Sequence, residues 1–347
     1  MDIQSYGLKT GRIILAFALA CMAMCSCDSV IYDDEGDCSI HYRVKFRYDY
    51  NMKFADAFAH EVNMVTLYLL DADDNVVWQR TERGDALSAD DYAMEIDGDI
   101  QPGEYSMMAW CGTDDKGSFD VNRSLKGRGL TCRLNRQQTA DGTAFVDEDI
   151  DRLFYGRLEK QTLGSEEGTY TYTMPLVKNT NNVRIVLQNL SGDPIDKDIF
   201  SFSITADNGI MDWDNSLIAD EPIIYKAWHT ESASADFGMS VESQTRQAAI
   251  TAYSAVVAEL TVARLVKGCD VRLTVTNNET DETVLSIPLI DYALLVKGYY
   301  NRNMSDQEYL DRQDVYDMVF FLDKDGSWMN SYIYINSWKV VFQDTEL

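Results

Sequence analysis

Alternation of apolar and polar residues is the feature of this sequence that most limits its fold. From Ser39 to Tyr50, every even-numbered residue is apolar or aromatic and every odd-numbered residue is polar or charged. Successive side chains of a β-strand point to opposite faces, so this period of two predicts a strand with one face on a core and the other in water. Similar patterns recur along the chain, and the sequence therefore predicts an all-β protein.

Other segments carry the same signal. Residues 59–82 predict a hairpin whose turn lies at 71–75, because Asp and Asn favour tight turns. Two more strands are predicted where apolar residues alternate, with inward faces formed by Tyr105, Met107, Ala109 and Cys111 and by Tyr170, Tyr172, Met174 and Leu176. The stretch 112–143 is rich in Gly, Asp, Arg and Asn, and it predicts a long surface excursion rather than part of a core.

The length of 347 residues favours two domains. A polar break, KNTNN at 178–182, separates one series of predicted strands from the next, and a helix-like segment follows at 291–314. We therefore expect an N-terminal β-sandwich domain at 39–177 and a C-terminal β-sandwich domain at 178–347.

The first 26 residues have the layout of a cleaved secretory signal. Lys9 and Arg12 precede an apolar stretch at 13–24, which is too short for a membrane span. Small or sulfur-bearing residues then lead to Cys27, so we expect a lipoprotein signal peptide at 1–26, a lipid on Cys27 and a polar tether at 27–38. Cys21 and Cys25 are alternative lipid sites, and an ordinary cleaved signal is the other interpretation.

The charge balance limits the partners. Asp and Glu number 57 against 30 Lys and Arg, a formal net charge of -27. Such a chain repels phosphates, so we expect no nucleic acid partner. Solubility at the cell exterior is a sufficient reason for the acidity.

Four cysteines follow Cys27: Cys38, Cys111, Cys132 and Cys269. An even number in an exported chain permits disulfides, but buried free thiols fit strand segments equally well. Their spacing contains no metal-binding CxxC pair.

Metal and catalytic chemistry have weak support in the sequence. The three histidines, His41, His60 and His229, are scattered without a ligand spacing. Asp71, Asp73, Asn75 and Glu82 match four positions of a calcium loop, but Val76 occupies the position that needs Gly. Because no nucleophile or phosphate-loop motif is present, we predict no catalytic, cofactor-binding or metal-binding residues and no enzyme activity.

Residues 27–71, CDSVIYDDEGDCSIHYRVKFRYDYNMKFADAFAHEVNMVTLYLLD, resemble the start of the FimB/Mfa-type fimbrial anchor subunits of type V pili. The resemblance lies in Cys27 with Asp28, the strand after Cys38, the run from Tyr48 to Asn51, Phe54 and the hairpin strand that ends at Leu70 and Asp71. It extends more loosely to the closing INSWKVV and so covers essentially the whole mature chain.

This resemblance implies a palmitate-bearing lipoprotein of the cell outer membrane with two tandem transthyretin-like β-sandwich domains. Such a protein sits at the base of a surface-exposed fimbrium, or pilus, and its partner is the stalk fimbrillin. Stalk subunits lose an amino-terminal strand and receive a neighbour's strand in the vacated groove. We expect the anchor to keep its own strand, residues 40–50, so that the groove stays closed.

The last strand is a candidate for contact with the stalk. If residues 332–342 form one strand, a single face carries Tyr332, Tyr334, Trp338, Val340 and Phe342. This strand could be donated to a stalk subunit and so limit fimbrial length, or it could complete the protein's own second sandwich.

A surface adhesin or glycan-binding lipoprotein is the alternative function. Its sugar platform would use exposed aromatic residues, for which the candidates are Trp110, Trp213, Trp228 and Trp328. Aromatic residues of sandwiches also commonly belong to the core.

Overall fold

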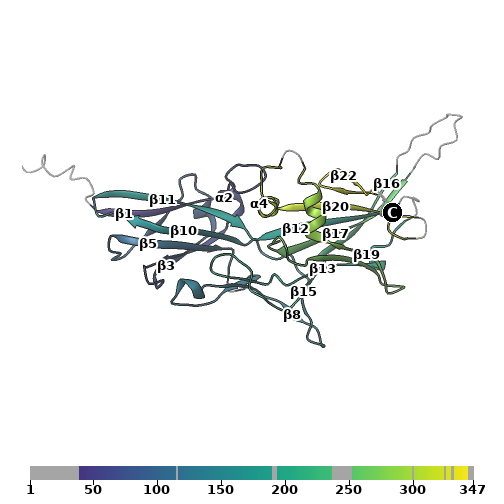
Figure 1. Cartoon of the computed structure of the whole chain (residues 1–347), viewed down its shortest axis with the longest axis horizontal. Helices are drawn as coiled ribbons and strands as arrows, with labels where there is room; N and C mark the ends of the chain where they lie inside the picture. Colours follow the sequence, from purple (N-terminus) through teal and green to yellow (C-terminus); the bar gives the residue numbers. More distant parts are fainter. Residues whose placement is uncertain are drawn as a thin grey trace, which may run out of the picture.

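The computed structural model describes residues 39–114, 116–189, 194–236, 252–298, 301–323, 326–329 and 332–342. The protein is all-β, as predicted, and its N-terminal and C-terminal halves follow one another along the long axis of the molecule (Figure 1). In these described ranges, no helix is long and apolar enough to cross a membrane.

A seven-stranded sheet forms most of the N-terminal half. Its strands, in spatial order, are β3 (Val76–Arg83), β2 (Met64–Leu70), β5 (Gly103–Cys111), β10 (Phe154–Leu163), β11 (Gly168–Lys178), β1 (Ile40–Arg47) and β4 (Met94–Ile96). Strand β11 pairs with β1 over most of its length and with β10 only at its last three residues, 176–178. The sheet therefore turns a corner at β11, and its two layers enclose a core.

The predicted alternation is confirmed for β1, whereas β2 and residues 107–111 of β5 are buried on both faces. Val44, Met107, Ala109 and Met174 are all fully buried in the core between the two layers. The predicted hairpin is present as β2 and β3, with a turn at 71–75. Two short helices connect strands of this half: α2 (Phe58–Glu61) lies between β1 and β2, and η1 (Gly84–Ser88) lies between β3 and β4.

Two six-stranded sheets form the C-terminal half. The first contains β16 (His229–Asp236), β17 (Ala252–Ala263), β12 (Thr180–Asn189), β20 (Val315–Leu322), β21 (Tyr332–Ile335) and β22 (Trp338–Val341). The second contains β19 (Glu282–Pro288), β18 (Arg272–Asn277), β13 (Phe200–Ala206), β15 (Ile223–Lys226), β9 (Ala144–Val146) and β8 (Gln137–Gln138).

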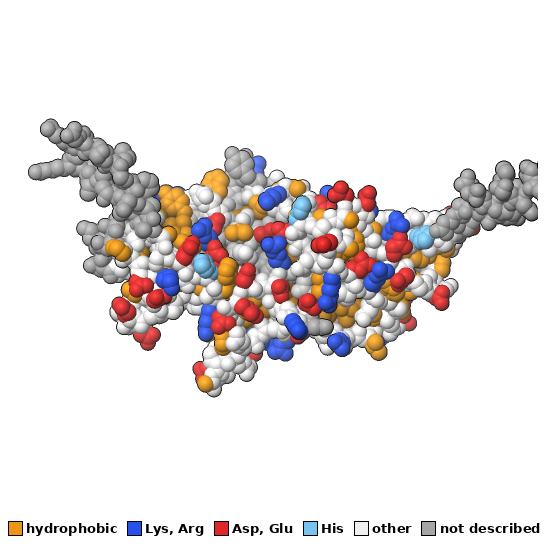
Figure 2. All heavy atoms as spheres, turned by 180° about the vertical axis from the view of Figure 1, so that it is seen from behind, with side chains coloured by type: hydrophobic (Ala, Val, Ile, Leu, Met, Phe, Trp, Pro, Cys, Tyr) orange, Lys and Arg blue, Asp and Glu red, His pale blue; other side chains and the backbone are white. Residues whose placement is uncertain are grey.

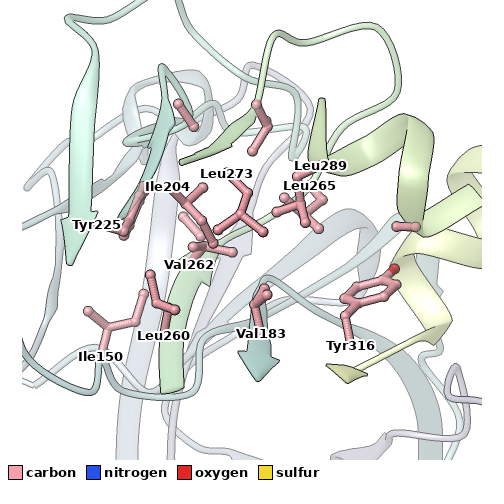
Figure 3. Close-up of a cluster of buried hydrophobic side chains, with 14 of the residues drawn as sticks. Ile150, Val183, Ile204, Tyr225, Leu260, Val262, Leu265, Leu273, Leu289 and Tyr316 are labelled. Carbon is pink, nitrogen blue, oxygen red and sulfur yellow. The ribbon is translucent and has the colours of Figure 1, made fainter. Parts of the chain in front are cut away.

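A continuous core joins these two sheets into a sandwich. Figure 3 shows Val183 and Leu260 from the first sheet facing Ile204 and Leu273 from the second. Ile150 of the N-terminal half lies in the same cluster, so the two halves share buried residues.

The segment 112–143 is not the surface excursion that its composition predicts. It forms β6 (Phe119–Val121), the turn η2 (Gly127–Gly129) and β7 (Cys132–Leu134), and β7 pairs with β14 (Ile210–Met211). It continues through β8 toward β9, which lies parallel to β15. Phe119, Cys132 and Leu134 are fully buried, so a few apolar residues outweigh the polar composition. Because the halves share strands in this way, the division at residue 177 stays a prediction.

The helix-like segment contains two short helices rather than one. These are α3 (Leu289–Leu295) and α4 (Asp306–Arg312), and the side chain of Ser305 caps α4 by accepting a hydrogen bond from the Glu308 amide. Elsewhere in this half, the short 3-10 helix η3 (Lys197–Ile199) precedes β13. Helix α4 lies where the two halves meet and leads directly into β20 (Figure 1).

Candidate functional site

Strand β1 occupies its own groove, as expected. It lies parallel to β11, with Ile40 opposite Gly168 and Arg47 opposite Pro175, and its middle pairs with β4 on the other side. Tyr42 and Phe46 are 5% exposed and Val44 is fully buried. Burying this face stabilises the strand by roughly 1.5 to 3 kcal/mol per large apolar side chain.

The outward face of β1 carries charge. The Arg43 guanidinium lies 2.7 Å from a carboxylate oxygen of Glu95 in β4, and Lys45 lies 3.6 Å from the exposed Asp91. These pairs are solvent-exposed and contribute little. The apolar face therefore holds β1 in place.

Beyond β1, the chain is bonded to the C-terminal half. The Tyr48 hydroxyl donates to the carboxylate of Asp314, at 2.9 and 3.1 Å from its two oxygens. Lys178 Nζ lies 3.7 Å from Asp314 and 3.6 Å from Glu61, although the Lys178 side chain is only 8% exposed. These four side chains form an ionic cluster at the junction of the halves.

Burial governs the protonation of this cluster. Desolvation raises the pKa of Asp314, while Lys178 and the Tyr48 hydroxyl oppose that rise. Desolvation and the neighbouring Asp314 charge raise the pKa of Tyr48. The hydroxyl therefore stays protonated and remains a donor at physiological pH.

Arg312, at the end of α4, holds the segment that follows β1. Its guanidinium lies 4.0 Å from the ring centroid of Tyr50 and donates to Glu308 at 2.8 Å and to the Asp49 carbonyl at 3.3 Å. Its own carbonyl accepts a hydrogen bond from the Met52 amide at 3.0 Å. We call the contacts of Tyr48, Asp49 and Met52 with Arg312 and Asp314 the junction clamp.

The C-terminal segment departs from its prediction. Residues 332–342 do not form one strand, because Asn336 and Ser337, with φ of 48° and 68°, turn the chain between β21 and β22. Positive φ at both central residues is the geometry of a two-residue hairpin turn. We refer to β21 and β22 with this turn as the terminal hairpin.

The hairpin separates the five predicted contact residues. Directly paired residues share a face, and Tyr332 pairs with Val341 whereas Val340 pairs with Ile333. The two tyrosines therefore lie on one face, and the other three predicted residues lie on the opposite face: Trp338, Val340 and Phe342.

The packing of the terminal hairpin differs between its strands. Tyr332 and Tyr334 contact the ring of Phe321, and Phe342 contacts the ring of Tyr292. Strand β22 is the edge of its sheet within the described residues, and its Trp338 is 60% exposed. An exposed edge strand can accept or supply backbone hydrogen bonds.

The four tryptophans do not all offer the exposed surface that a sugar platform needs. Trp110 is fully buried, and its indole N–H donates to the Leu130 carbonyl. Trp213 is half-buried and lies beneath the guanidinium of Arg157, 4.3 Å from its ring centroid. Trp228 and Trp328 are also half-buried.

Hydrogen bonds within the calcium-like loop already engage its first carboxylate, Asp71. Asp71 accepts hydrogen bonds from the Asp73 amide and from the amide and side chain of Asn75. These bonds lower the pKa of Asp71. Within the residues that the structure describes, no group of three His, Cys, Asp or Glu could hold a metal ion.

The described thiols Cys111, Cys132 and Cys269 are free, and burial raises the pKa of each. Cys38 and the predicted lipid sites Cys27, Cys21 and Cys25 lie outside the described residues.

Two open hollows of about 810 and 800 Å³ adjoin the N-terminal sheet. They share Met64, Arg83 and Asp114, and the latter two form an ion pair of 3.1 Å. Figure 2 likewise shows acidic and basic side chains interspersed over the face in view. This surface has mixed charge despite the strongly acidic composition.

Solved structures similar to this chain come from Bacteroides and Porphyromonas. A putative adhesin of Bacteroides thetaiotaomicron is 30% identical, with a TM-score of 0.76 over 89% of this chain and 100% of its own. A structure from the same organism, described as putative polysaccharide binding proteins, is 30% identical with a TM-score of 0.73 over 89% of this chain and 100% of its own.

The fimbrial anchor protein Mfa2 of Porphyromonas gingivalis has the same fold. Its TM-score is 0.62 at 16% identity, over 88% of this chain and 100% of that one. No curated protein matches the chain. The family model of the fimbrillin-A associated anchor proteins Mfa1 and Mfa2 matches residues 34–344 of this sequence. Because this match spans nearly the whole chain, the protein belongs to the family of fimbrillin-A associated anchor proteins.

Proposed function

We propose that this protein is a lipid-anchored outer-membrane subunit that holds a fimbrium at the cell surface and ends its assembly. The observation that carries the proposal is the position of β1 within its own sheet, where Val44 is fully buried. A groove filled by its own strand has no room for a neighbour's strand. A subunit of this kind stands at the end of a polymer rather than within it.

The proposed membrane attachment is a lipid on Cys27, close before β1 in the sequence. A lipid there fixes the protein to the membrane and ties down the amino-terminal segment. A single acyl chain gives only marginal membrane binding, so stable attachment needs a second chain or another membrane-binding signal.

Substitution of the lipid site tests this proposal. In cells that make Cys27→Ala, we expect the protein in the soluble fraction and fimbriae in the medium. Cys21→Ala and Cys25→Ala are matched controls that should leave both at the membrane. Retention of Cys27→Ala at the membrane would refute the lipid assignment, and its release without loss of fimbriae would refute the anchoring role.

The terminal hairpin is the proposed contact with the stalk fimbrillin. It sits in its own sheet, where the described residues show Ile335 and Tyr334 of β21 paired with Met318 and Val319 of β20, and Asn336 hydrogen-bonded to the Asp317 backbone. These bonds and the burial of Ile333 and Ile335 would have to be given up for the hairpin to leave the sheet and join another subunit. The competing role, completing the second sandwich, uses the same pairs.

Deletion of residues 336–347 separates these two roles. Circular dichroism and membrane fractionation first establish that the shortened protein folds and reaches the membrane. If the hairpin binds the stalk, the shortened protein loses its fimbriae to the medium. A folded, membrane-bound variant that retains its fimbriae rules out strand donation by this segment.

A glycan-binding role is the second candidate, because similar solved structures are described as a putative adhesin and as putative polysaccharide binding proteins. Half-buried Trp213 and Trp228 would be its aromatic contacts. Binding to a glycan array that disappears in Trp213→Ala or Trp228→Ala would support this role; an array without binding would exclude it for the glycans tested.

A further inference from the structure

Two parallel strand pairs lie in line along the molecule. Strand β1 runs parallel to β11, and β12 runs parallel to β20. Only Asn179 separates β11 from β12, so these two strands form one nearly continuous line through both halves. Figure 1 shows this line crossing the junction, with β1 beside it in the N-terminal half and β20 beside it in the C-terminal half.

The junction clamp connects β1 to β20 end to end. Tyr48 directly follows β1, and Asp314, which accepts its hydroxyl, directly precedes β20. The Asp314 carbonyl also accepts a hydrogen bond from the Asn182 amide of β12, at 2.9 Å. The end of one strand is thus bonded to the start of another strand that has the same direction.

This arrangement suits a pulling force. If the segment before β1 is pulled along the strand axis, the hydrogen bonds between β1 and β11 lie across the direction of the load and strain together. The same force draws Tyr48 away from Asp314 and Asp49 away from Arg312. Tyr48 is 1% exposed, so the donor side of this bond is shielded from water, whereas its acceptor Asp314 is 28% exposed.

We propose that the junction clamp is a mechanical splice that passes tension from β1 to β20 and so shares the load between two lines of strands. Its role in the cell rests on the proposed anchoring function, in which the membrane pulls on one end of the protein and the fimbrium on the other. Without the clamp, tension on β1 would pass first to its pairing strands β11 and β4 and reach the C-terminal half from there.

Single-molecule force measurements on the isolated mature chain test the splice. One handle is attached ahead of Ser39 and the other at Thr280, in the exposed turn between β18 and β19. Tyr48→Phe removes the hydroxyl and keeps the ring. We expect its lifetime under constant load to fall about tenfold or more, as for loss of a hydrogen bond to a charged group.

Tyr155→Phe is the matched control. Tyr155 is 6% exposed and also joins the two halves, because its hydroxyl donates to the Trp213 carbonyl at 2.7 Å, but it lies on β10. We expect this variant to keep the lifetime of the unchanged protein. An equal loss in both variants would overturn the splice, since tension would then be spread over the whole junction; so would an unchanged lifetime in Tyr48→Phe.

A second pulling geometry separates tension from general stability. With handles ahead of Ser39 and at Thr169, which lies opposite His41, the β1–β11 pairs open one after another from the near end. We expect lower rupture forces, with no effect of Tyr48→Phe. A shortened lifetime in both geometries would show a stability effect alone and overturn the proposal.

These measurements need neither lipid nor fimbria, so they stand apart from the anchoring proposal. Release of fimbriae by Cys27→Ala together with an unchanged lifetime in Tyr48→Phe would refute the splice alone. A shortened lifetime together with fimbriae that stay attached in Cys27→Ala would refute the anchoring proposal and leave the splice as a property of the fold.

Discussion

Truncation of Phe46 tests whether the apolar face of β1 keeps the groove filled. Phe46 is 5% exposed and pairs in register with Met174. Its ring centroid lies 5.6 Å from that of Phe58 and 6.4 Å from that of Tyr92. Removing a buried aromatic ring costs its transfer free energy and leaves a cavity, about 3 to 5 kcal/mol in all. A domain has a free energy of unfolding of about 5 to 15 kcal/mol, so much of the stability would be lost.

Urea denaturation followed by circular dichroism measures this loss, and Lys45→Ala is the matched control. Lys45 is the neighbour of Phe46 on the outward face, and its ammonium lies near only an exposed carboxylate, so we expect an unchanged midpoint. Hydrogen exchange should then show faster exchange of the β1 amides in Phe46→Ala. Equal midpoints for the two variants would refute the conclusion that the apolar face retains β1.

Alkaline pH tests the buried tyrosines. Burial raises the pKa of Tyr68 and Tyr155 to about 12, against about 10 in the unfolded chain, so their stabilisation is complete below pH 10 and is lost as the pH rises toward 12. Each should lower the free energy of unfolding by about 2 to 3 kcal/mol as the pH reaches 12, measured by urea denaturation, and Tyr68→Phe should remove the share of Tyr68. Arg136→Leu breaks a buried bidentate pair with Asp220 and should cost about 3 to 5 kcal/mol, much of which Arg136→Leu with Asp220→Leu restores in the same assay. Phe119→Ala should lower the unfolding free energy by about 3 to 5 kcal/mol, which a residue of a surface loop would not do.

Local patterns predicted the strands whose partners lie nearby. Alternation alone identified β1 and the inward face of β5, and the Asp71 to Asn75 turn identified the hairpin of β2 and β3. These elements are specified within a few residues, by side-chain period and by turn chemistry.

Composition gave a wrong prediction where a few buried residues determine the structure. In 112–143, single apolar residues such as Phe119 and Leu134 are buried among polar neighbours, and a window average hides them. The terminal hairpin was missed because its turn, Asn336 and Ser337, lacks the Gly that usually marks such turns. Asn was the one signal available there, since it adopts positive φ more readily than most residues.

Tyr48 shows why the junction clamp could not be predicted from sequence. Its place in the alternation requires only a large apolar ring, and phenylalanine would meet that requirement equally well. The hydroxyl has a use only because Asp314, 266 residues later, lies within 2.9 Å of it. Period and propensity describe the faces of one strand, whereas this bond depends on where β20 begins in space. The role of this tyrosine can therefore be inferred only once the fold is known. Tyr48→Phe removes the hydroxyl alone and so measures the contribution of its bond to Asp314.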